Sequence, residues 1–115
     1  MSKSFLSSWI VYAAISHAAK SGLFKGQKNL ARQAQLQIKR MASPRTAFGR
    51  QLKLLHSLRG KPATTMELCR STGVSRRTLF RDLAALRAAG VKVVSDGTRF
   101  ALKDKMLRAA LGKLA

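Results

Sequence analysis

Apolar residues recur at helical spacing in six stretches of the chain, and polar or helix-ending residues separate these stretches. The spacing predicts α-helices over residues 2–19, 29–42, 43–59, 65–72, 76–89 and 105–114. Residues 91–102 differ, because two β-rich runs flank Asp96-Gly97 there, and Asp-Gly between such runs is typical of a β-hairpin. The pattern therefore predicts a mainly α fold with one small hairpin.

The middle helix is expected to begin with Ser43 as its N-cap and Pro44 in its first turn. Gly60 and Pro62 should end this helix, because neither residue continues it favourably. Its apolar residues recur at the spacing of one inward face, and they are Phe48, Leu52, Leu55 and Leu58.

Residues 64–82 have the signals of two short helices joined by a tight turn. Thr64 is a candidate N-cap for the first helix, with Glu67 as the other half of a capping box. Gly73 stands where that helix must stop, a position that favours a residue tolerant of positive φ. Ser75 is expected to cap the second helix. This pattern predicts a helix-turn-helix, in which the second helix enters the DNA major groove.

The second helix has a core-facing side and a side rich in arginine. Leucines at spacings of four and three residues face inward, Phe80 widens this stripe, and Val74 of the turn should pack between the two helices. The inward leucines are Leu79, Leu83 and Leu86. The arginines are left for the other sides of the helix.

Candidate DNA contacts gather at the start of the second helix and in the hairpin. Arginines there can grip guanine with two hydrogen bonds, while hydroxyls and backbone N–H groups hold phosphate. A hairpin directly after such a helix is a wing, and Arg99 near its tip is expected to reach the DNA backbone or the minor groove. Because the charge of Asp96 is unwelcome beside phosphate, we expect its side chain to cap the turn. The candidates are Ser75, Arg76, Arg77, Thr78, Arg81, Arg87, Lys92 and Arg99.

From about residue 50 to residue 102, the chain resembles the winged helix-turn-helix at the N-terminus of DeoR-type and WYL-domain bacterial transcription regulators. The residues that carry the resemblance are Gly73-Val74-Ser75-Arg76-Arg77-Thr78-Leu79, Arg81-Asp82-Leu83 and Leu86-Arg87-Ala88-Ala89-Gly90-Val91. In that family the Ser-Arg-Arg-Thr helix start contacts DNA, so the resemblance implies DNA contact for residues 75–78 and, by the same analogy, for Arg81.

Two departures from the family pattern limit what the resemblance implies. Thr72 stands where the family usually has an apolar residue, so we expect a less tightly packed turn. No ligand-sensing domain follows the wing before Ala115. We therefore expect nucleic-acid binding without control by an effector.

The charge of the whole chain extends the picture beyond the helix-turn-helix. Lys and Arg total 23 against four acids, for a net charge of +19, and residues 1–44 contain no acid. This excess is larger than solubility requires and indicates a polyanionic partner: DNA first, RNA as the alternative, and an anionic membrane surface third. The N-terminal part is expected to add phosphate contacts, for which the candidates are Arg32, Lys39, Arg40 and Arg45.

The helices at the two ends of the chain have apolar sides whose partners the sequence leaves open. The first, over 4–19, is too short in its apolar core to span a bilayer. It either packs on the winged domain through Phe5, Trp9, Tyr12 and Ile15, forms a homodimer or partner interface, or lies on a membrane. The last helix, over 105–114 and capped by Asp104, either dimerises the protein or covers the N-terminal helices.

We thus expect a basic helical extension over 1–42, a winged helix-turn-helix over 43–103 and a C-terminal helix over 104–115. The four scattered acids form no evident carboxylate pair, and no phosphate loop or nucleophile elbow is present, so an enzyme is not expected. Cys69 is the single cysteine and lies far from both histidines, so we expect a buried structural thiol, no metal and no cofactor. The expected setting is the bacterial or phage-infected cytoplasm, near the nucleoid.

Three functions are compatible with these features. The first is a small sequence-specific transcriptional regulator, and the second is a nucleic-acid-binding subunit of a larger nucleoprotein complex. The third is a sequence-tolerant architectural DNA-binding protein. An arginine-headed recognition helix argues against the third, because charge neutralisation does not need that geometry. The large positive charge favours the second.

Overall fold

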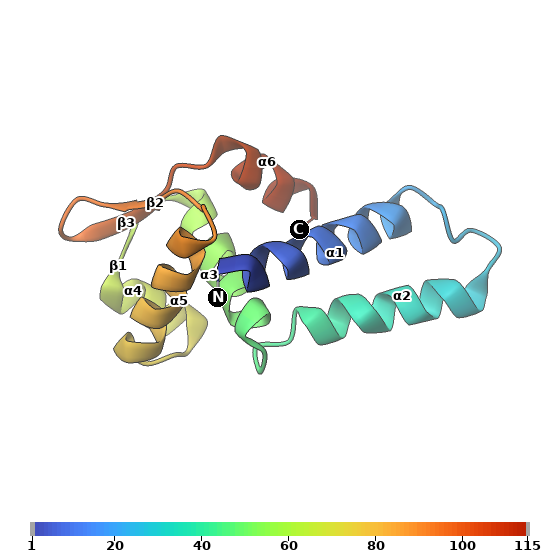
Figure 1. The fold of residues 1–115 in the computed structure, drawn as a ribbon, viewed down its shortest axis with the longest axis horizontal. Helices are drawn as coiled ribbons and strands as arrows, with labels where there is room; N and C mark the ends of the chain where they lie inside the picture. Colours follow the sequence, from blue (N-terminus) through green and yellow to red (C-terminus); the bar gives the residue numbers. More distant parts are fainter. Residues whose placement is uncertain (1, 115) are drawn as a thin grey trace.

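The computed structural model describes the backbone of residues 2–114 and the side chains of residues 5–112 (Figure 1). Met1 and Ala115, which end the predicted segments 1–42 and 104–115, lie outside the described residues. The elements are α1 (Ser2–Lys20), α2 (Lys28–Met41), α3 (Ala47–Gly60), β1 (Ala63–Thr64), α4 (Thr65–Thr72), α5 (Arg76–Ala88), β2 (Val93–Ser95), β3 (Arg99–Leu102) and α6 (Lys105–Leu114).

Three helices and a small sheet form a winged unit at one end of the molecule. The helices α3, α4 and α5 pack on one another, and the hairpin β2–β3 extends beside them (Figure 1). The sheet is antiparallel in the order β1-β3-β2, with Ala63 opposite Phe100 and Val93 opposite Leu102. This architecture confirms the predicted winged helix-turn-helix and adds a third strand, β1, which the sequence pattern did not predict.

Leucine side chains form most of the core of this unit. The four predicted inward residues of α3 and the three predicted inward leucines of α5 are buried, and the α4 residue Leu68 is fully buried. Strand residues close the core from the side of the sheet. The largest fully buried side chains are Leu54, Leu55, Leu68, Leu79, Leu83, Leu86, Leu102 and Leu111.

The start of α3 differs from the sequence prediction. The N-cap is Thr46, whose Oγ1 accepts a hydrogen bond of 2.9 Å from the Gly49 N–H, and not Ser43. Ser43 and Pro44 instead belong to a turn in which the Ser43 carbonyl accepts a 3.1 Å bond from the Thr46 N–H. This turn crosses over the first turn of α3 so closely that a Cβ atom at Gly49 would collide with the Ser43 carbonyl.

The helices α1 and α2 form a hairpin that extends away from the winged unit and makes the molecule 51 Å long (Figure 1). Phe5 and Tyr12 of α1 are buried against Phe48 of α3, with ring centroids 5.6 and 5.5 Å apart. The predicted aromatic face of α1 therefore packs on the winged unit. No helix within residues 2–114 has the length and apolar content needed to cross a bilayer.

The C-terminal helix α6 covers α1 and α3. Asp104 caps it as predicted, since its Oδ1 accepts a 3.1 Å hydrogen bond from the Leu107 N–H. Leu107 and Leu111 are buried, whereas Met106, expected on the same apolar side, is 85% exposed because it lies a third of a turn away from Leu107. The Arg108 guanidinium donates to the Arg59 carbonyl at 3.0 Å and so caps the last turn of α3. The side chain of Leu114 lies outside the described residues.

Candidate nucleic-acid interface

The turn between α4 and α5 has each of the predicted caps. The Thr64 hydroxyl accepts from the Glu67 N–H at 3.2 Å, and the Glu67 carboxylate accepts from the Thr64 N–H at 2.9 Å. The hydrogen bond from the Thr64 backbone, followed by one from the Thr64 side chain, holds the pKa of Glu67 below its usual value. Gly73 ends α4 with φ 74° and ψ 25°, the left-handed conformation that a glycine adopts without strain. The angle at which α5 leaves α4 is thereby fixed.

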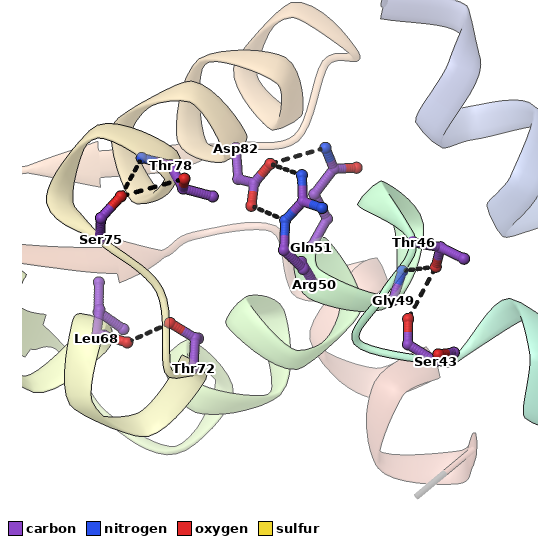
Figure 2. Close-up of polar contacts among 10 residues, drawn as sticks. All are labelled: Ser43, Thr46, Gly49, Arg50, Gln51, Leu68, Thr72, Ser75, Thr78 and Asp82. Atoms are coloured by element: carbon purple, nitrogen blue, oxygen red, sulfur yellow. Dashed lines mark hydrogen bonds and ion pairs between the residues drawn. The ribbon is translucent and has the colours of Figure 1, made fainter.

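Two positions near this turn differ in detail from the sequence prediction. Thr72, where an apolar residue was expected, donates a 2.6 Å hydrogen bond from its hydroxyl to the Leu68 carbonyl, so its polar group is satisfied inside α4 (Figure 2). Cys69 is half-buried and not buried, because it follows the fully buried Leu68 by one residue and so lies at the edge of the core.

Hydrogen bonds between Ser75 and Thr78 hold the first turn of α5. The Ser75 Oγ accepts a 3.2 Å bond from the Thr78 N–H and donates to the Thr78 Oγ1 at 3.2 Å (Figure 2). Ser75 is therefore the N-cap, as predicted. Arg76 and Arg77 follow directly and are exposed. The positive end of the α5 dipole and these guanidinium groups together favour an anion at this helix start.

One side of α5 is in the core and the opposite side is in solvent. The buried side carries the three predicted leucines. On the opposite side, Arg77 and Arg81 stand one turn apart, and Ala84 and Ala88 continue the same exposed side toward the end of the helix. This side therefore has two long cations at its beginning and two small side chains after them.

A buried ion pair holds α5 on the first turn of α3. The Asp82 carboxylate, only 3% exposed, accepts from Arg50 Nε at 3.2 Å and Nη2 at 3.3 Å, and from the Gln51 side-chain amide at 3.4 Å (Figure 2). The sequence pattern did not predict this cluster. Its one signal was an acid on the core side of α5, and nothing in the sequence pattern identified a partner 32 residues earlier.

The wing is held in shape by Asp96. Its Oδ1 accepts from the Arg99 N–H at 2.8 Å, from the Thr98 N–H at 2.9 Å and from the Thr98 hydroxyl at 3.0 Å. The bond from the Arg99 backbone, followed by those from Thr98, lowers the pKa of Asp96 to about 2. The carboxylate thus caps the turn, as predicted. The Arg99 side chain begins β3 and is exposed.

Contacts between α5 and the wing involve two residues to which the sequence analysis gave other roles. Arg87, a candidate for DNA contact, donates from Nε to the Val93 carbonyl at 3.1 Å and lies 5.8 Å from the ring centre of Phe100. Phe80 was expected to widen the core stripe, but it is 43% exposed and meets the edge of Phe100 at 6.3 Å. Both side chains position the wing relative to α5, because Phe100 is the wing residue that faces α5.

The remaining candidates are exposed but are not all close to α5. Lys92 lies in the link from α5 to β2, and Arg45 lies in the turn before α3. Arg32, Lys39 and Arg40 are on α2, in the hairpin that extends from the winged unit (Figure 1).

Comparison with known families agrees with this geometry. A family model described as an HTH domain matches residues 50–99, from the first turn of α3 to the first residue of β3. No curated protein and no solved structure matches the chain. The matched range contains the capped turn, α5 and the wing turn. The chain therefore carries a helix-turn-helix DNA-binding domain over residues 50–99.

Proposed function

We propose that the protein is a small sequence-specific regulator of transcription, in which α5 enters the major groove and the wing contacts the neighbouring backbone. The observation that carries this proposal is the exposed side of α5. Arg77 and Arg81 stand at its beginning, where they reach base edges, and the small side chains of Ala84 and Ala88 let the rest of the helix approach the DNA.

The other candidates take roles that suit their positions. We assign Ser75, Arg76 and Thr78 to the DNA at the start of α5, where the helix dipole also favours phosphate. Arg99 reaches the backbone or minor groove from the wing, and Lys92 contacts the backbone. Arg87 is a weaker candidate for a backbone contact, because its Nε is bonded within the wing.

The resemblance to DeoR-type and WYL-domain regulators supports this assignment through the Ser-Arg-Arg-Thr start of α5. We accordingly assign sequence recognition to the winged helix-turn-helix over 43–103. The basic extension over 1–42 and the C-terminal helix over 104–115 support it or bind further partners.

Selection from a randomised duplex pool tests the proposal. At about 200 mM salt, loose electrostatic binding is suppressed. A sequence-specific regulator then retains and enriches a motif, and a palindromic motif identifies a dimer on two half-sites. Loss of all sequences together contradicts the proposal and favours either a sequence-tolerant architectural protein or a subunit that needs its partner.

A second candidate function is a nucleic-acid-binding subunit of a larger nucleoprotein complex. One observation favours it: α1 exposes Leu6, Ile10 and Val11 at 42%, 65% and 46% on a helix with no charged residue between Phe5 and Ser16. An uncharged apolar surface on so basic a chain suits contact with another protein. Under this alternative, the purified chain shows no sequence preference in the selection, and preference appears when the partner is added.

A further inference from the structure

We propose that the interface with DNA continues from α5 onto the α1–α2 hairpin through a row of arginines, namely Arg81, Arg45 and Arg40, here called the arginine track. The track holds phosphates of the duplex beside the site that α5 occupies. This inference rests on the proposed function, and it adds a second contact region outside the helix-turn-helix.

Two surface hollows, both lined by Phe48 at the start of α3, place two of the three arginines, Arg81 and Arg40, beside that helix start. One hollow lies between α5 and the start of α3, and Arg81, Asp82, Ala47 and Phe48 are among its lining residues. A second hollow lies between α2 and the start of α3, and its lining includes Arg40, Gln37, Thr46 and, again, Phe48. The start of α3 is therefore flanked by Arg81 on one side and by Arg40 on the other.

The third arginine, Arg45, lies in the turn between α2 and α3, next to Thr46, which lines the hollow beside α2. Several hydrogen bonds fix the turn. The Ser43 carbonyl accepts from the Thr46 hydroxyl at 2.9 Å (Figure 2). The same carbonyl accepts from the Thr46 N–H at 3.1 Å, and the Ser43 hydroxyl accepts from the Arg45 N–H at 3.3 Å. The close approach of this turn to Gly49 holds it further. Each arginine of the track therefore lies on a backbone segment that hydrogen bonds hold in place: Arg81 on α5, Arg45 in the turn and Arg40 on α2.

No carboxylate competes with DNA along the track. The chain has no acid before Glu67. The nearest acid is Asp82, which is 3% exposed and already bonded to Arg50 and Gln51. Among the side chains of residues 5–112, no ion pair involves Arg40, Arg45 or Arg81. The guanidinium groups are therefore available for bidentate contact with phosphate.

The duplex backbone fits this row better than a single strand does. Proteins that hold single strands pair their cations with exposed aromatic rings on which bases stack. The aromatic residues that line the two hollows, Phe5 and Phe48, are 3% and 8% exposed and belong to the core. Phe80, which precedes Arg81, packs against Phe100 of the wing. A row of cations without stacking rings suits the regularly spaced phosphates of a duplex.

The chain offers a charge-matched control on the same hairpin. Lys25 and Lys28 are also exposed, but they lie in and beside the loop that joins α1 to α2, at the end of α2 opposite to Arg40. The variant Arg40→Ala/Arg45→Ala removes two charges from the track, whereas Lys25→Ala/Lys28→Ala removes two charges from the far end of the hairpin.

The test uses the full chain and the duplex enriched by selection, prepared with about ten flanking base pairs on each side or trimmed to the motif. Affinity is measured between about 50 and 200 mM salt. Two lost phosphate contacts lower the salt slope on the flanked duplex by about 1.8, and the trimmed duplex shows less of this loss. The Lys25→Ala/Lys28→Ala variant keeps a slope close to that of the wild type.

Three results overturn the arginine track. An equal decrease of the salt slope in both double variants shows a general effect of the net charge. An unchanged slope for Arg40→Ala/Arg45→Ala shows that these residues do not meet phosphate. If Arg40→Ala/Arg45→Ala weakens binding to single-stranded DNA or to RNA but not to the duplex, the track binds a different nucleic acid. Failure of the proposed function is distinct, because the wild type then shows no preferred duplex at all.

Discussion

At the scale of single residues, Asp82 connects α5 to the rest of the domain. It is the buried acid of a very basic chain, and its carboxylate accepts three hydrogen bonds from Arg50 and Gln51. These bonds set how α5 sits on α3, and therefore where Arg77 and Arg81 point. A structural ion pair thus positions the candidate interface without forming part of it.

Removal of this carboxylate should destabilise the fold. Asp82→Ala leaves Arg50 and Gln51 without their acceptor, and we expect the free energy of unfolding to fall by about 2 kcal/mol, as for hydrogen bonds to charged groups. Urea denaturation measures this change. A double-mutant cycle with Arg50→Ala should show coupling between the two residues. Additive effects of the two substitutions would show that the ion pair contributes nothing to stability.

At the scale of elements, the crossing of the α2–α3 turn over the first turn of α3 determines how the hairpin joins the winged unit. Thr46 caps α3, and Gly49 provides the space for the Ser43 carbonyl. The same turn carries Arg45. The position of α2 relative to α5 therefore depends on a close backbone contact as well as on the aromatic packing of Phe5 and Tyr12.

Substitution of Gly49 should show this dependence directly. Gly49→Ala places a methyl group against the Ser43 carbonyl, and we expect a loss of about 1–3 kcal/mol in the free energy of unfolding, as for overpacked sites. The matched control is Gly112→Ala in α6, where the added Cβ meets only the end of the Arg59 side chain, at 3.4 Å. Alanine favours a helix at that position, so the control should be neutral or stabilising. If both variants unfold at the same urea concentration as the wild type, the crossing is looser than described.

At the scale of the whole molecule, sequence signals predicted the winged unit because they act over a few residues. The capping box of Thr64 and Glu67, Gly73 and the Asp96 turn each specify backbone geometry locally. The elements that were missed depend on distant partners. Strand β1 has two residues and exists through pairing with β3, and Asp82 finds its partner 32 residues away.

For the candidate interface, too, the sequence predicted the parts that local signals specify and not the parts that depend on distant partners. The start of α5 and the wing tip could be located from the motif, since both follow capping signals. The roles of Phe80 and Arg87 could not, because each depends on where Phe100 of the wing packs. The arrangement of Arg40 and Arg45 relative to Arg81 likewise depends on the turn over Gly49, which no periodic pattern in the sequence reveals.

The central claim, that α5 recognises base sequence through its first arginines, is tested most directly at Arg77. Kd is measured at about 200 mM salt, where loose phosphate binding is weak, for the enriched duplex and for a scrambled duplex of the same composition. The proteins compared are the wild type, Arg77→Ala, Arg77→Lys and the control Arg70→Lys on the exposed surface of α4.

If Arg77 grips a base, Arg77→Ala lowers the preference for the enriched duplex by about 1–3 kcal/mol. Arg77→Lys loses most of the same preference, because an ammonium group cannot reproduce the two parallel hydrogen bonds of a guanidinium. Arg70→Lys retains the wild-type preference. Equal weakening of both duplexes by Arg77→Ala, together with wild-type behaviour of Arg77→Lys, would make Arg77 a phosphate contact and contradict the account.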